Sequence, residues 1–199
     1  MSDAELIAAY RHGDKEALEI LIKRYLAPVY RFLLRLVHNQ ETANDLSQET
    51  FFKAWRSLWR FDAKRSFKTW LFTIAKNTAF DYLKKKKAFV FSELDGPEDG
   101  QTFDERIPDE RPLAFELIEQ HDQAQFVNQI LALVSPQARS IILMHDGEDM
   151  TFQEISSVMH ESLNTVKSRY RRALLLLQKK MKDLNNGSVP GISLTHAPK

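Results

Sequence analysis

The sequence predicts an all-α protein in which two small helical units are joined by an acidic linker. Apolar residues recur at three- and four-residue spacing in both halves of the 199-residue chain, and this period is typical of amphipathic helices. The alternation of apolar and polar residues that marks half-buried strands is absent. We expect one unit over residues 1–87, a linker over 88–118 and a second unit over 119–184.

Three helices are expected in the first unit. The longest apolar stripe runs from Leu18 to Val37, and two further periodic segments cover residues 41–58 and 67–86. The period breaks over Arg60–Ser66, which predicts a loop between the second and third helices. Aromatic residues at helical spacing are most often part of a core, so we expect Trp55, Trp70 and Tyr82 to be buried. We expect Trp59 and Phe61, beside the loop, to be exposed.

The linker and the C-terminal tail lack a core of their own. Residues 88–118 contain nine acidic and two basic residues, and the span Gly96–Pro112 contains two glycines and three prolines. This composition predicts a flexible connection. Residues 185–199 are short, polar and interrupted by proline, so we expect a disordered tail.

The second unit has the outline of a helix-turn-helix. A helix is expected over residues 122–134, and Ser135-Pro136 then supplies an N-cap and a first helical residue for another that ends near Asp146-Gly147. Thr151 and Glu154 form a capping-box pattern that opens a short helix ending at Met159. After a tight break, Ser162 caps a long helix over residues 163–184. A short helix, a turn and a long basic helix are typical of DNA-binding units.

The long helix is basic on one side. Residues 163–182 contain seven basic and no acidic residues, although the whole chain has a net charge of only +1. Its apolar residues can seat it on the unit; they are Val166, Tyr170, Ala173, Leu174 and Leu177. The residues that then project are Lys167, Ser168, Arg171 and Arg172, whose side chains can bond base edges in a major groove. The competing interpretation is a basic surface helix of a bundle.

A second basic block lies in the first unit. Residues 62–87 contain eight basic and two acidic residues, interleaved with aromatic rings. Cations that follow phosphates, beside rings on which bases stack, suit single-stranded nucleic acid. The competing interpretation is that the rings belong to the core.

Other classes of function find little support in the sequence. The chain has no cysteine, which excludes disulfides, thiol catalysis and cysteine-ligated zinc. There is no HExxH spacing and no glycine-rich phosphate loop, so we expect no enzyme, no cofactor, no metal and no small-molecule substrate. Asp45 and Glu49 could hold a cation with Asp146, Glu148 or Asp149, but a solvated face or a partner contact is the favoured interpretation. With no secretory signal and no apolar run of bilayer length, we expect a soluble, cytoplasmic protein without membrane insertion.

Several motifs resemble the sigma factors of bacterial RNA polymerase. Asp45–Trp55 (DLSQETFFKAW) and Phe67–Ala79 (FKTWLFTIAKNTA) are similar to the second conserved region of that family. Thr151–Ile155 (TFQEI) and Thr165–Arg169 (TVKSR) are similar to the fourth region. Two such regions with only a short linker between them resemble the extracytoplasmic-function (ECF) subgroup.

The resemblance implies a promoter-specificity subunit that binds core RNA polymerase and promoter DNA and helps to open the duplex. It implies docking on the clamp helices of the β′ subunit through Asp45, Gln48, Glu49, Phe52 and Lys53. The β subunit of the polymerase is a further expected partner. It implies contact with the −10 element through Trp59, Arg60, Phe61, Lys64, Arg65, Lys68, Lys76, Asn77 and Lys84. It implies contact with the −35 element through Thr165, Lys167, Ser168, Arg171 and Arg172.

The resemblance also implies an anti-sigma factor that holds the protein inactive. Trp59-Arg60 departs from the small polar or acidic pair of many members, and Asn164 replaces a common glycine. From the residues alone, two alternatives remain open. One is a stand-alone helix-turn-helix regulator whose first unit is a sensor or dimerisation module, and the other is an all-α protein adaptor.

Overall fold

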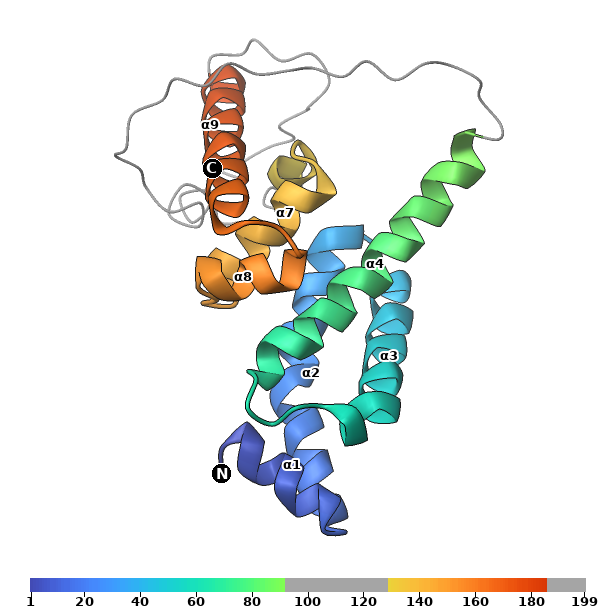
Figure 1. The fold of residues 1–199 in the computed structure, drawn as a ribbon. Helices are drawn as coiled ribbons and strands as arrows, with labels where there is room; N and C mark the ends of the chain where they lie inside the picture. The colour runs from blue at the N-terminus through green and yellow to red at the C-terminus, as the bar shows by residue number, and fades with distance from the viewer. Residues whose placement is uncertain (92–128, 186–199) are drawn as a thin grey trace, which may run out of the picture.

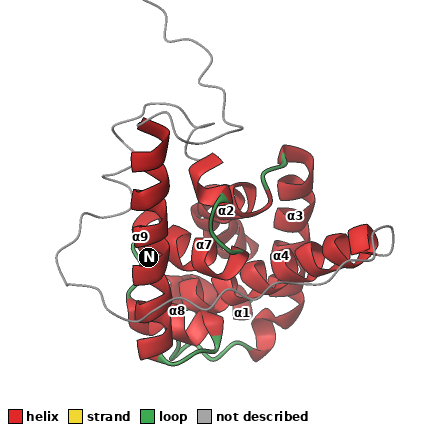
Figure 2. Ribbon diagram, turned by 90° about the horizontal axis from the view of Figure 1, so that it is seen from above, coloured by secondary structure: helices red, strands yellow, loops and turns green. Residues whose placement is uncertain are grey.

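The computed structural model describes residues 1–91 and 129–185, and these residues form helices without any strand (Figures 1 and 2). The linker prediction falls mostly on residues 92–128 and the tail prediction on residues 186–199, which lie outside the described residues. Of the helix expected over 122–134, residues 129–132 are helical and the rest lies outside the described residues or in a turn. The all-α prediction is confirmed.

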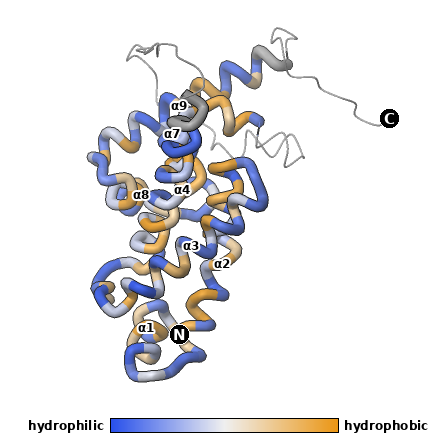
Figure 3. The backbone as a smooth tube through the Cα atoms, turned by 90° about the vertical axis from the view of Figure 1, so that its right-hand side faces the viewer, coloured by the Kyte–Doolittle hydropathy of each residue, from blue (hydrophilic) through white to orange (hydrophobic). Residues whose placement is uncertain are grey.

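The first unit, residues 1–91, contains four α-helices around an apolar core. Their bounds are α1 Asp3–Arg11, α2 Lys15–Val37, α3 Gln40–Ser57 and α4 Phe67–Phe91, with a short 3₁₀ turn, η1, over Leu58–Arg60. Apolar and polar residues alternate along these helices in short stretches (Figure 3), as expected where each helix has one buried face. The three predicted helices are confirmed within a few residues, and α4 extends five residues further than expected.

Helix α1 is absent from the sequence-based expectation. Its signal is a capping box: the Ser2 side chain accepts from the amide of Glu5, and the Glu5 carboxylate accepts from the amide of Ser2. This pattern marks a helix start but spans only four residues before an apolar pair. That pair, Leu6 and Ile7, is fully buried, which ties the helix to the core.

The second unit, residues 129–185, is a helix-turn-helix. Its elements are α7 Pro136–Ile142, a π-helical stretch η2 Leu143–Gly147, α8 Phe152–Met159 and α9 Leu163–Asn185. The predicted caps are confirmed: Ser135 caps α7, Thr151 and Glu154 form a reciprocal box at α8, and the Ser162 hydroxyl accepts from the Thr165 amide. His160, at the turn, has a left-handed backbone conformation with φ of 56°, which ends α8.

The two units pack against one another through α4 on α8 and α2 on α7 and η2. Arg139 of α7 is buried at this junction. Its guanidinium donates to the carbonyls of Leu131 and Val134 in its own unit and to the Leu36 carbonyl near the end of α2, at 2.7, 3.2 and 2.9 Å. It also contacts Nε2 of His38 at 2.6 Å, and burial, with this cation nearby, lowers the pKa of His38. The charge thus satisfies carbonyls at the ends of elements from both units.

Helix α1 also holds the loop between α3 and α4 in place. The Arg11 guanidinium donates to the carbonyls of Leu58 and Trp59, at 3.0 and 3.4 Å, and to that of Phe61. These carbonyls lie just past the end of α3, and that of Leu58 also accepts from the Phe61 amide of η1 at 3.2 Å. A side chain some 47 residues away in sequence therefore sets the path of the loop that leads into α4.

Arg11→Ala should lower the free energy of unfolding by about 1–3 kcal/mol, because partly buried carbonyls lose their donor. Urea denaturation of the full chain measures the change. Lys23→Ala, at an exposed position of α2, is the matched control and should change it by no more than about 0.5 kcal/mol. Equal effects of the two substitutions would contradict the role assigned to Arg11.

Candidate nucleic-acid interface

The loop between α3 and α4 presents one exposed aromatic ring and buries another. The Trp59 side chain is 61% exposed, as predicted. Phe61 is only 5% exposed, so the prediction that it is exposed is wrong. Its ring lies 5.6 Å from that of Phe67 and 4.9 Å from that of Trp70. The first turn of α4 brings these two rings over the loop, and together the three rings close that end of the core.

The loop carries exposed basic residues on a backbone that is held by local hydrogen bonds. The Asp62 carboxylate accepts from the Lys64 amide at 3.0 Å, and the Asp62 carbonyl accepts from the Arg65 amide at 2.9 Å. The Ser66 hydroxyl then accepts from the Thr69 amide and starts α4. Arg60, Lys64 and Arg65 therefore reach solvent beside Trp59, and the structure brings these four predicted residues together.

The predicted cations of α4 divide into two sets. Asn77 and Lys84 are exposed. Lys68 is half-buried and donates to the Glu148 carbonyl of the second unit. Lys76 is only 6% exposed, with its ammonium 5.7 Å from the Phe80 ring centre, and burial lowers its pKa. In this arrangement the second unit lies against the part of α4 from which Lys68 and Lys76 project.

Helix α9 is seated as the sequence predicts. Val166, Tyr170, Ala173, Leu174 and Leu177 are all buried, and the Tyr170 hydroxyl donates to Asp146 at 2.8 Å. On the outer side Lys167, Arg171 and Arg172 are exposed, with Thr165 and Ser168 partly so. Arg169 instead forms a two-bond ion pair with Glu161 in the turn, at 3.0 and 3.3 Å. The ion pair in the turn and the buried side of α9 fix the helix so that its row of cations faces solvent.

The exposed face of α3 carries the residues expected to dock on a protein. These residues, Asp45, Gln48, Glu49, Phe52 and Lys53, are all exposed and share one side of the helix. Lys53 pairs with Glu49 at 2.7 Å and donates to the Thr78 hydroxyl at 3.1 Å. Because Glu49 is neutralised in this way, the face is mixed in charge rather than acidic.

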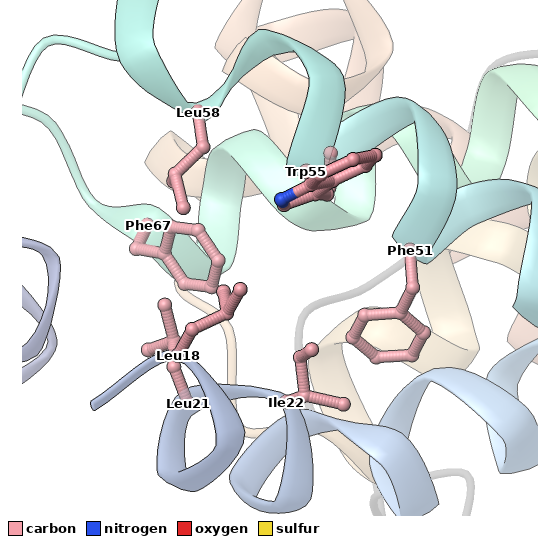
Figure 4. A pocket seen from close by; sticks show the side chains of 8 residues that line it. Leu18, Leu21, Ile22, Phe51, Trp55, Leu58 and Phe67 are labelled. Carbon is pink, nitrogen blue, oxygen red and sulfur yellow. The ribbon is translucent and has the colours of Figure 1, made fainter. Parts of the chain in front are cut away.

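The prediction that Trp55 belongs to the core is wrong. Its side chain is 49% exposed, and its indole nitrogen donates to the Tyr10 hydroxyl at 2.9 Å. Trp70 and Tyr82, by contrast, are partly buried against the core as expected. Trp55 lies 6.1 Å from the ring of Phe52 and lines a small apolar pocket with Leu18, Ile22 and Phe51 between α2 and α3 (Figure 4). Helical spacing could not reveal this, because it does not say which face of α3 is covered.

The described ranges 1–91 and 129–185 contain no group of three side chains that could ligate a metal ion. Among their helices, none combines the length and the apolarity needed to span a membrane.

Both units match known protein families. Residues 21–89 match Sigma-70 region 2, and residues 127–177 match Sigma-70, region 4. The ECF RNA polymerase sigma factor SigW of Bacillus subtilis is 27% identical over 180 residues, which cover 89% of this chain and 96% of SigW. The RNA polymerase sigma-H factor of Pseudomonas aeruginosa is 28% identical over 184 residues, which cover 92% and 95%.

Solved structures share the fold. The sigma factor RpoE of Bartonella quintana, solved with the anti-sigma factor NepR, superposes with a TM-score of 0.64 at 23% identity, over 83% of this chain and 96% of RpoE. CnrH, solved with the cytosolic domain of CnrY, gives a TM-score of 0.65 at 23% identity, over 90% and 97%.

The match of the first unit to region 2 does not favour a stand-alone regulator with a sensor or dimerisation module. The two regions occur in the family's order, and full-length ECF relatives align over nearly the whole chain. The chain therefore belongs to the ECF sigma factors, the promoter-specificity subunits of bacterial RNA polymerase.

Proposed function

We propose that this sigma factor uses three separate surfaces. Helix α9 binds the −35 element, and the loop after η1 together with α4 binds the −10 strand. Helix α3 docks on core RNA polymerase. The observation that carries the proposal is the exposed row Lys167, Arg171 and Arg172 on a helix whose opposite side is buried. A recognition helix needs this combination of a buried side that holds it on the unit and exposed side chains that can reach base edges.

For the −35 element, the first turns of α9 carry the contacts. Arg171 and Arg172 suit guanine O6 and N7 in the major groove, Lys167 suits either a base or a phosphate, and Ser168 suits several base edges. Thr165, at the start of the helix, lies where a backbone phosphate meets the helix N-terminus.

For the −10 element, Trp59 offers a stacking platform to an unpaired base, and Arg60, Lys64 and Arg65 offer charge to its phosphates. Asn77 and Lys84 extend this surface along α4, together with Lys68 and Lys76 once the second unit has moved off them. Phe61 supports the loop from inside the core and does not contact the strand, because its ring is buried.

For core polymerase, Phe52 and Trp55 form the apolar centre of the α3 surface, and Asp45, Gln48, Glu49 and Lys53 form its polar rim. Arg56, whose guanidinium lies 5.6 Å from the Phe52 ring centre, adds to it. The expected partner is the clamp-helix pair of the β′ subunit, with the β subunit contacting other parts of the chain. An anti-sigma factor is a further expected partner, as the Bartonella quintana relative was solved with one.

Promoter-specific transcription by this chain with core polymerase tests the function as a whole. Transcript starts mapped after overexpression define the −35 and −10 sequences, and a template carrying them should give a start site in vitro only when both the chain and core polymerase are present. Tight binding of the free chain to an operator, without such transcription, would instead point to a stand-alone regulator.

Arg172→Ala should cost about 1–3 kcal/mol in −35 recognition, the value of one good bidentate base contact. The measurement is the promoter affinity of the reconstituted holoenzyme on templates with intact and altered −35 elements. For this variant the affinities for the intact and the altered template should become similar. Lys179→Ala, which removes an exposed cation further along the same helix, should keep it.

Phe52→Ala should weaken binding to core polymerase by about 2 kcal/mol or more, because a central aromatic residue dominates an interface of this kind. Competition with wild-type protein for limiting core polymerase measures the loss. The control is Ile20→Ala on α2, which removes an exposed apolar side chain that helical phase places opposite Leu18 and Ile22. The docking role of α3 fails if both variants compete as well as wild type.

A further inference from the structure

Glu148 is a carboxylate buried at the contact between the two units. It follows η2 in the second unit and is only 8% exposed. Its Oε1 lies 3.6 Å from the Arg31 guanidinium of α2, and its carbonyl accepts from the Lys68 ammonium of α4. Arg35, one turn beyond Arg31, faces the same carboxylate closely enough to lower its pKa. Three cations of the first unit therefore surround one anion of the second.

The fit of this anion is loose. Among the described residues its carboxylate has one ion pair, and the 3.6 Å of that pair exceeds the ~2.7–2.9 Å of a charge-assisted hydrogen bond. Burial is the largest influence on Glu148 and raises its pKa, against the opposing effect of the three cations. A buried carboxylate without close bonds recovers little of its desolvation cost, so another anion can replace it.

The arginines of this cluster are placed so that they can bind an anion between them. Arg31 and Arg35 are like charges on adjacent turns, and burial, with the Arg31 charge adding to it, lowers the pKa of Arg35. Like charges held this close repel one another unless an anion lies between them. Guanidinium groups match the oxygens of a phosphate diester in two-bond geometry.

The position of this cation cluster indicates which nucleic-acid strand would supply the phosphate. Lys68 is in the first turn of α4, directly after the loop that exposes Arg60, Lys64 and Arg65. A strand bound along that loop would reach Lys68 and then the arginines of α2. A second acidic residue of the helix-turn-helix unit, Glu161, pairs with Arg169, and its charge only partly offsets the burial that lowers the pKa of Lys76. Glu148 thus lies against cations of the first unit at a place where a DNA backbone would bring negative charge.

We propose that Arg31, Arg35 and Lys68 form a phosphate-binding site for single-stranded promoter DNA, and that Glu148 occupies this site until the two units separate. The proposal rests on the assignment of the −10 strand to the loop and α4. It extends that surface onto α2 and makes the contact between the units autoinhibitory.

Fluorescence anisotropy with a labelled 12-nucleotide oligo(dT) tests the site in the full-length chain. Glu148→Gln should raise the affinity at least about threefold, because the fraction of open sites increases. Glu19→Gln removes an equal charge from an exposed position of α2 and should raise it far less. The gain should vanish when Arg31→Ala and Arg35→Ala are also present, since the three residues act on one site.

The two arginine substitutions alone should reduce the affinity and make the slope of log K against log salt shallower by about 1.4, for two lost phosphate contacts. Arg31→Lys with Arg35→Lys should restore part of the affinity and part of the salt dependence. Thermal melts check that each variant is folded. Equal effects of Glu148→Gln and Glu19→Gln, or a gain that persists without the arginines, would overturn the proposal. Promoter-specific transcription by wild type with core polymerase would still stand in that case. Its absence would instead count against the proposed function.

Discussion

Helix α2 packs against elements of both described units. The helix is apolar on more than one side: Leu21, Val29, Phe32, Leu33 and Leu36 are buried beneath α1, α3 and α4, and its C-terminal half also meets α7 and η2 of the second unit. Because one helix packs against neighbours from both units, its position sets the entry of α4 into the core and the place at which the second unit rests.

Charged side chains form the contacts at the interface between the two units. The first unit carries a cation-rich surface on α2 and α4, and the second unit offers Glu148 to it and Arg139 to the end of α2. These contacts bring ionic groups out of water, which costs free energy that a single long ion pair does not fully return. An interface built in this way can hold the units together and still open when a better anion or a protein partner is present.

Sequence reasoning succeeded wherever the deciding residues lie within one or two turns of each other. The caps at Ser135, Thr151 and Ser162 and the buried stripe of α9 follow from local patterns. It failed for Phe61 and Trp55, whose exposures are 5% and 49%. Periodicity shows that a ring belongs to a helix or follows it, but a ring is buried only if another element covers it. Phe67 and Trp70 cover Phe61, whereas α1 reaches only the indole nitrogen of Trp55.

The sequence by itself determined the helical character of both units, the outline of the helix-turn-helix, the row of cations on α9 and the resemblance to the sigma family. Local hydrogen bonding and the 3.6-residue period are properties of neighbours in the chain, so they can be read from it directly. Only the tertiary structure decided that Arg11 fixes the loop, that Lys76 is covered, and that Glu148 lies among Arg31, Arg35 and Lys68. Lys68 and Glu148 are 80 residues apart, and no local rule relates two charges at that separation. They meet because apolar faces elsewhere in the chain pack together.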